Sequence, residues 1–160
     1  MKIVCFIDSL GSGGAQRQMV ELALKFKQNK HDVIFMIYHD INFFKFVLEK
    51  SEIPIILINE LSILSRVIKC RKIIRRLKPD VVLSFLQTPN FIATISSFPF
   101  RNWKLVVGER SADHAILKSF KRRFFRLLHL TVDYVVANSE CNIKIIKEAN
   151  PLLNHNKCHV

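Results

Sequence analysis

The chain has 160 residues, of which 49% are hydrophobic, and 25 lysines and arginines outnumber 13 aspartates and glutamates to give a net charge of +12. This hydrophobic share excludes a disordered chain, and the low counts of glycine (4) and proline (5) exclude a collagen-like or linker-rich one. Length and composition together predict one basic globular domain.

Two features bear on the compartment. The four cysteines form no CxxC pair and no disulfide framework, which favours a reducing, cytoplasmic environment. The uncharged stretch 81–100 is long enough to cross a bilayer, but Gln87, Thr88, Pro89 and Asn90 lie at its centre. We therefore expect a buried strand, a polar loop and a short buried helix there instead of a membrane span.

Apolar runs and helical periodicities alternate along the chain, which predicts strands alternating with helices. We expect strands at 2–7, 33–38, 55–58, 81–85, 105–107 and 134–137, with the start of another at 157–160. We expect helices at 14–28, 43–50, 63–77, 116–130 and 140–149, the last capped by Ser139. This order predicts an α/β fold: a Rossmann-like, doubly wound, mostly parallel sheet with helices on both faces.

Three of the four glycines, Gly11, Gly13 and Gly14, lie between the first expected strand and the first expected helix. Glycine allows close backbone approach, and the N–H groups that begin a helix favour an anion such as phosphate. A tight turn with no ligand explains the same spacing. A dinucleotide fingerprint fails because Gln16 stands at the third glycine position, and the Gly-Lys-Ser/Thr of a P-loop is absent.

Five segments in order resemble glycosyltransferase family 4. Residues 6–17 (FIDSLGSGGAQR) resemble its Gly-Gly-Ala-x-Arg opening, and 31–33 (HDV) its "GHEV" strand entry, with Lys30 replacing the usual glycine. Residues 78–84 (KPDVVLS) resemble "KPDVVHSH", with Phe85 where a histidine is common. Residues 107–113 (VGERSAD) resemble the "SERNDP" loop of members acting on lipid-linked sugars, and 133–140 (DYVVANSE) the "D-V-A-S-E" strand and cap.

The resemblance implies a GT-B fold, in which two Rossmann-like domains face each other and a sugar passes from a nucleotide-activated donor to an acceptor. Residues 1–150 would form the N-terminal, acceptor-side domain, and 151–160 would begin the connection to a missing C-terminal domain. No cofactor is implied beyond a nucleotide-sugar donor as co-substrate. The chain by itself is expected to be inactive, because the glutamates that contact the donor in the C-terminal domain are absent.

The resemblance also implies roles for the glycine loop. The backbone of Gly13 and Gly14, with Gly11 in the same loop, would approach the donor diphosphate. Arg17 matches the arginine of the motif and would pair with a phosphate, although an arginine in the first turns of a helix is more often solvated.

A second set of candidates follows the strand at 105–107, at the edge where open α/β sheets bind ligands. Glu109 and Arg110 are expected to bind substrate, with Arg110 suited to an acceptor phosphate. Asp113 would orient an acceptor hydroxyl. His114 is a candidate acid or base, although a lone loop histidine is usually structural or solvent-facing. No metal is expected, because no second pair of ligands completes a zinc site around His155, Cys158 and His159.

The positive charge gathers in two segments, 61–80 and 116–126. They hold twelve basic residues: Arg66, Lys69, Arg71, Lys72, Arg75, Arg76, Lys78, Lys118, Lys121, Arg122, Arg123 and Arg126. For either helix alone, a solvated polar face explains the charge. Docking on an anionic membrane surface explains both and would suit a lipid-linked or glycan acceptor at the inner face of the cytoplasmic membrane. Nucleic acid is not expected as a partner, because the interleaved phenylalanines have core spacing and no reading motif occurs.

The sequence thus predicts the N-terminal domain of a glycosyltransferase of cell-surface glycan assembly. A non-catalytic Rossmann-like domain that binds a phosphorylated ligand is the alternative from a different class.

Overall fold

The computed structural model of the chain describes residues 1–110 and 115–160, apart from the side chains of Ala115, Lys121 and His155. These residues form one parallel sheet with the strand order β3-β2-β1-β4-β5-β6-β7. The strands are β1 (Lys2–Phe6), β2 (Asp32–Ile37), β3 (Ile55–Leu57), β4 (Val81–Phe85), β5 (Lys104–Glu109), β6 (Tyr134–Ala137) and β7 (Cys158–His159). The helices are α1 (Gly14–Gln28), α2 (Lys45–Lys50), α3 (Ile63–Leu77), α4 (Gln87–Ser96), α5 (Ala115–Lys118), α6 (Phe120–Leu127) and α7 (Glu140–Ala149), with short 3-10 turns η1 (Leu128–Thr131) and η2 (His155–Lys157).

This architecture confirms the Rossmann-like, doubly wound fold. Strands β4 and β6 begin and end at the residues that their apolar runs predict, and the expected strand at the end of the chain is β7, which pairs with β6. β1 is buried along most of its length, as a strand covered on both faces must be.

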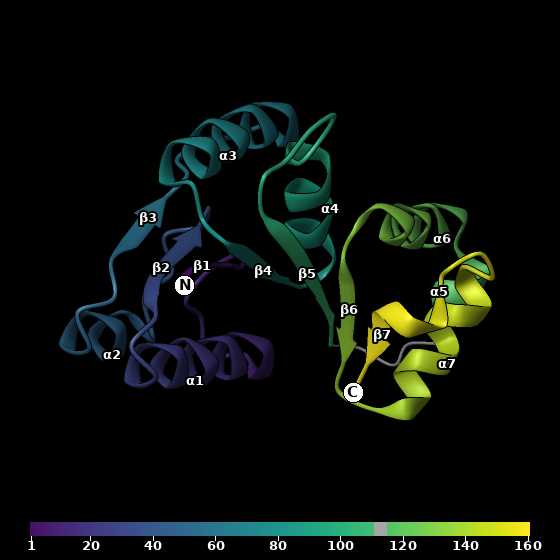
Figure 1. The fold of residues 1–160 in the computed structure, drawn as a ribbon, viewed down its shortest axis with the longest axis horizontal. Coiled ribbons are helices and arrows are strands. Elements are labelled where there is room, and N and C mark those ends of the chain that lie inside the picture. Colours follow the sequence, from purple (N-terminus) through teal and green to yellow (C-terminus); the bar gives the residue numbers. More distant parts are fainter. Residues whose placement is uncertain (111–114) are drawn as a thin grey trace.

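Two apolar layers cover the sheet. On one face, α1 and α2 contribute Met19, Val20 and Leu48 to a cluster with Cys5 of β1 and Phe35 of β2. On the other face, α3, α4 and α7 pack on the alternate residues of the same strands. Figure 1 shows α1 and α2 on one side of the sheet and α3 and α4 on the other.

The strand order turns at β1, which lies between β2 and β4. The chain leaves β1 toward α1 on one face and leaves β4 toward α4 on the other, so the two loops diverge. A crevice therefore opens at the carboxyl edge of the sheet between these loops, where α/β proteins bind ligands.

Three sequence expectations are corrected. The polar stretch at Gln87–Asn90 is the first turn of α4 instead of a loop, because Leu86, with φ 75° and ψ 153°, turns the chain directly from β4 into the helix. The helix expected at 116–130 is interrupted at Ser119, whose hydroxyl caps α6 by accepting from the Arg122 N–H. Phe120 and Phe124 are exposed instead of lying in the core.

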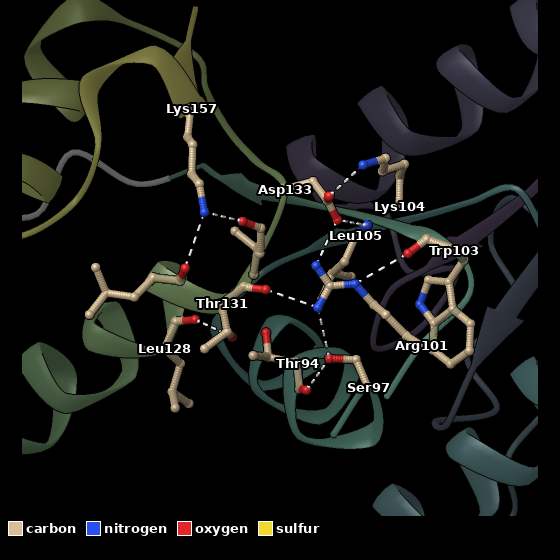
Figure 2. Close-up of polar contacts among 12 residues, drawn as sticks. Thr94, Ser97, Arg101, Trp103, Lys104, Leu105, Leu128, Thr131, Asp133 and Lys157 are labelled. Carbon is tan, nitrogen blue, oxygen red and sulfur yellow. Dashed lines mark hydrogen bonds and ion pairs between the residues drawn. The ribbon is translucent and has the colours of Figure 1, made fainter. Parts of the chain in front are cut away.

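An ion cluster around Asp133 closes the opposite, amino-terminal edge of the sheet (Figure 2). The Asp133 carboxylate accepts from Arg101 Nη2 at 2.7 Å, Lys104 Nζ at 3.0 Å and the Leu105 N–H at 2.9 Å. Arg101 also donates to the Thr131 carbonyl at 2.9 Å. The cluster therefore joins the starts of β5 and β6 and the end of η1.

Burial by itself raises the pKa of the Asp133 carboxyl, but the hydrogen bonds from Leu105, Arg101 and Lys104 outweigh burial and hold that pKa below its usual range. A lowered native pKa means that Asp133 stabilises the fold above the ordinary aspartate pKa of about 3.9. That contribution is lost as the pH falls through the native pKa.

We expect Asp133→Ala to lower the free energy of unfolding by roughly 1–3 kcal/mol at neutral pH, because the Leu105 N–H and Arg101 lose their acceptor. Asp32→Ala is the matched control, since Asp32 also starts a strand but is 60% exposed and pairs with Lys2 at 3.5 Å. The control should change the unfolding free energy by about 0.5 kcal/mol or less. Urea unfolding at several pH values measures both, and the deficit of Asp133→Ala should shrink in acid. An equal loss in the two variants would contradict this role.

Candidate functional site

A cavity of about 530 Å³ lies at the carboxyl edge of the sheet. Its walls come from the residues that follow β1, β4, β5 and β6 and from α6. The lining residues are Gly14, Ala15, Gln18, Leu86, Gln87, Glu109, Arg110, Ile116, Arg122, Arg126 and Asn138. The cavity thus occupies the crevice that the strand order creates, and it contains three arginines against one glutamate.

The glycine loop presents the start of α1 to this cavity. Gly13 is the N-cap of α1, and it has no side chain that could accept hydrogen bonds from the first turn. The first N–H groups of this 15-residue helix are therefore open to an acceptor from outside the helix. Such an arrangement favours a phosphate or another anion.

The fold itself does not require glycine at these positions. Neither Gly13 nor Gly14 has a positive φ. A Cβ on Gly14 would meet no atom within 4 Å, and one on Gly13 would meet only the flexible side chain of Gln16. Neither backbone strain nor internal packing explains a glycine at position 14. Its lack of a side chain leaves open space beside the cavity.

Gly108 is different, because internal packing requires it. A Cβ there would overlap Cδ1 of the Phe85 ring. The Phe85 ring occupies this space and supports Arg110, whose guanidinium carbon lies 3.7 Å from the ring centroid. The stacking holds Arg110 at the cavity wall, and burial lowers the pKa of its guanidinium. Arg110 Nε is buried without a hydrogen-bond partner among the described residues.

Glu109 forms a buried ion cluster in the cavity wall. Its Oε2 accepts from Arg126 Nη2 at 2.7 Å, and its Oε1 lies 2.9 Å from His129 Nε2. All three side chains are at most 5% exposed. The Asn142 side chain of α7 donates to the Glu109 carbonyl at 2.9 Å. One residue therefore ties β5 to α6, η1 and α7.

Burial by itself raises the pKa of the Glu109 carboxyl, but its interactions with His129 and Arg126 outweigh burial and hold that pKa below its usual range. Glu109 is therefore ionised at neutral pH. Both of its oxygens already have partners, so the cluster fixes Arg126 in the cavity wall.

The structure brings together three of the predicted substrate-binding residues, Gly14, Glu109 and Arg110, with Gly13 one residue away. Gly11 and Arg17 are not among the described lining residues. A Cβ on Gly11 would be in ordinary contact with Ser9 and Ile41, and Arg17 Nε donates to Glu21 at 2.8 Å on the exposed face of α1. Asp113 and His114 lie outside the described residues, and their catalytic roles stay predictions.

The sequence does not predict the other eight lining residues, of which five are polar. Gln18 lies on α1, Gln87 begins α4 and Asn138 follows β6, and Arg122 and Arg126 belong to the segment whose charge the sequence explains by a solvated helix face or a docking surface. One signal was available, since Arg122 and Arg126 are four residues apart and share a helix face.

The described part of the chain holds no group of three or more histidine, cysteine, aspartate or glutamate side chains that could bind a metal ion. The expected absence of a metal stays a prediction. None of the described helices is long and apolar enough to span a membrane.

Solved structures share this fold. Anabaena Alr3699/HepE in complex with UDP-glucose superposes with a TM-score of 0.77 at 21% identity, over 99% of this chain and 42% of its own. UDP-GlcNAc 2-epimerase from Neisseria meningitidis, bound to UDP-GlcNAc, gives 0.72 at 17% identity, over 100% and 46%. These similarities show that the chain shares its Rossmann-like fold with slightly less than half of each of these proteins.

Comparison of the sequence with known proteins identifies the protein family. The chain belongs to Glycosyltransferase Family 4, whose family profile matches residues 12–160. It is 28% identical to the N-acetylgalactosamine-N,N'-diacetylbacillosaminyl-diphospho-undecaprenol 4-alpha-N-acetylgalactosaminyltransferase of Campylobacter jejuni subsp. jejuni serotype O:2. That match covers 99% of this chain and 47% of the relative, so the chain spans about half the length of the curated protein.

We expect Glu109→Gln to lower the free energy of unfolding by about 3–5 kcal/mol, because it leaves the buried Arg126 guanidinium without a countercharge. Glu21→Gln is the matched control, since it removes an exposed Glu21–Arg17 pair. That control should change the unfolding free energy by about 0.5 kcal/mol or less. Chemical denaturation of the three proteins measures the difference, and similar stabilities would show that the buried cluster is not a structural anchor.

The two glycines at the site should respond to alanine in opposite ways. Gly14→Ala should leave stability unchanged or raise it by up to about 1 kcal/mol, because alanine favours the helix and meets no neighbour. Gly108→Ala should lower stability by about 1–3 kcal/mol, because its methyl group overlaps Phe85. Thermal unfolding of both variants checks this, and a destabilised Gly14→Ala would mean that the fold requires this glycine after all.

Proposed function

We propose that this chain is the acceptor-side, N-terminal part of a GT-B glycosyltransferase. The whole enzyme would transfer a sugar from a nucleotide-activated donor to a lipid-linked or glycan acceptor in cell-surface glycan assembly. The observation that carries the proposal is the cavity in which the open start of α1 and the arginines of the β5 edge and α6 face the same space. Both groups suit phosphate oxygens.

Two sets of relatives support the substrate classes. The two structural neighbours are described with UDP-glucose and UDP-GlcNAc, and the Campylobacter jejuni enzyme acts on a sugar attached to diphospho-undecaprenol. Family membership favours sugar transfer over the epimerase reaction that the same fold also supports. A nucleotide sugar and a lipid-linked acceptor are therefore the co-substrates that we propose.

We propose separate roles for the glycine loop, Arg110 and Glu109. The backbone of Gly13 and Gly14 would approach the donor diphosphate, which the C-terminal domain would hold across the crevice. Arg110, preorganised on the Phe85 ring, would bind an acceptor phosphate. Glu109 would act by holding Arg126 and α6 in place.

A lipid-linked acceptor places the enzyme at a membrane. We propose that it works as a peripheral protein at the inner face of the cytoplasmic membrane. The +12 net charge supports this, because cytoplasmic leaflets carry anionic lipids.

We expect the chain to bind geranyl diphosphate, a short soluble prenyl diphosphate, as measured by isothermal titration calorimetry. Arg110→Ala should weaken this binding by about 10- to 100-fold, because it removes a charge-assisted hydrogen bond. Arg76→Ala, on the exposed face of α3, is the matched control and should bind as the wild type does. Equal affinity of all three proteins for the ligand would contradict the assigned role of Arg110.

We also expect the 160 residues alone to release no UDP from a UDP-sugar in the presence of a prenyl-diphosphate-linked acceptor, because the donor-side domain is not part of them. Chromatography of the nucleotide products measures this. Prenyl diphosphate binding without turnover also fits a non-catalytic binding domain, and adding the donor-side domain distinguishes the two: sugar transfer then supports the glycosyltransferase. Turnover by the chain alone would contradict the proposed division between domains.

A further inference from the structure

Helices α3, α4 and α6 lie side by side, and we call the outer side of this layer the α3–α4–α6 surface. Most of its exposed residues come from α3 and α6, because Thr88 is the only exposed residue of α4. Arg71 of α3 donates to the Ser96 carbonyl of α4 at 2.9 Å, and the Ser96 hydroxyl donates to the Val67 carbonyl of α3 at 3.0 Å. On the other side of α4, Phe91 packs against Phe125 of α6 with ring centroids 4.9 Å apart. Figure 1 shows α4 between α3 and α6.

The helices of this surface are strongly basic, and the carboxylate of Glu60 just before α3 pairs with Lys69 at 3.8 Å. The sequences of α3, α4 and α6 contain no aspartate or glutamate, whereas α1, α2 and α7 each contain at least one. The basic residues of α3 are Arg66, Lys69, Arg71, Lys72, Arg75 and Arg76, and those of α6 are Lys121, Arg122, Arg123 and Arg126. Arg126 is buried against Glu109, and Arg122 lines the cavity. The exposed basic side chains described on this surface are Lys69, Lys72, Arg75, Arg76 and Arg123.

The same surface exposes large apolar side chains. On and just before α3, Leu61 is 97% exposed, Leu64 71% and Ile68 61%. Leu64 and Ile68 are four residues apart on α3 and lie in one stripe, which continues along the helix to Lys72 and Arg75, whereas Leu61 precedes the N-cap Ser62. Apolar side chains in line with lysine and arginine are typical of a helix that lies in a membrane interface.

Aromatic side chains extend this stripe. Arg75 Nη2 donates to the Phe100 carbonyl at 3.4 Å, which holds the turn between α4 and β5 beside α3. Phe100 in that turn is 78% exposed. On α6, Phe120 and Phe124 are also exposed. Apolar residues in this number are not isolated surface positions, and they indicate an interaction site.

We infer that the α3–α4–α6 surface docks on an anionic lipid bilayer, with Leu64, Ile68 and the exposed phenylalanines entering the interface. A second copy of the chain fits this surface poorly, because both partners would bring positive charge. Nucleic acid would match the charge but gives leucine and isoleucine nothing to stack on. A bilayer with acidic headgroups accommodates both features.

The inference rests on the proposed function and makes it more specific, because one face of α6 lines the cavity and another belongs to the docking surface. Arg122 and Arg126 line the cavity, whereas Phe120 and Phe124 are exposed. Docking through these phenylalanines would bring the cavity next to the headgroups. A lipid-linked phosphate could then reach the arginines without leaving the bilayer.

The test is sedimentation of the 160-residue chain with phosphatidylcholine vesicles, with and without phosphatidylglycerol. We expect binding only to the anionic vesicles and weakening with salt. The double variant Lys72→Gln/Phe100→Ser should bind at least about tenfold more weakly, of which about fivefold comes from the charge. Phe120→Ser/Arg123→Gln should weaken binding similarly. Circular dichroism checks that both variants are folded.

The matched control is Lys50→Gln/Phe46→Ser on α2, which removes the same two residue types from a helix that contains Glu49. Phe46 is 73% exposed, close to the 78% of Phe100, and Lys50 is also exposed. The control should bind vesicles as the wild type does. Equal weakening in the control, no binding to anionic vesicles at low salt, or a gel shift with RNA at lower protein concentration than vesicle binding requires would overturn the inference. These vesicles contain no prenyl diphosphate, so the result is independent of the geranyl diphosphate test.

Discussion

The ionised carboxylate of Glu109 is the constraint on which the site depends. A buried charge is costly unless it is paired, and here the cost is offset by Arg126 and His129, which belong to the chain segment after β5. The pairing fixes α6 against the end of the sheet. Helix α6 also supplies Arg122 to the cavity and exposes Phe120 and Phe124 to solvent. The buried Glu109 cluster therefore positions both the cavity wall and the exposed aromatic face of α6.

The fold was predictable where local sequence decides it. The apolar run 81–85 and the helix 140–149 with its Ser139 cap follow from periodicity and capping, and both have the expected bounds. Gln87–Asn90 misled the prediction because polar residues and a proline are typical of loops. Proline is nonetheless tolerated in a first helical turn, where no intrahelical partner is needed for its nitrogen.

The site was predictable only in part, for a similar reason. The glycine loop and the residues after β5 carry local signals, and the strand order brings them together. The partners of Glu109 lie 17 and 20 residues away in sequence, and no spacing rule connects a buried carboxylate to them. The exposure of Phe120 and Phe124 was also missed, because phenylalanine at helical spacing usually indicates a core face.

The side chain on which Arg110 stacks determines whether that contact depends on pH. In the family motif that residues 78–84 resemble, a histidine is common where this chain has Phe85. A protonated imidazole beneath a guanidinium would repel it, so an arginine on a histidine would be held more weakly as the pH falls through the histidine range of about 6–7. A phenyl ring takes up no proton. The stacking that holds Arg110 in this chain is therefore independent of pH over the range in which a histidine would become protonated.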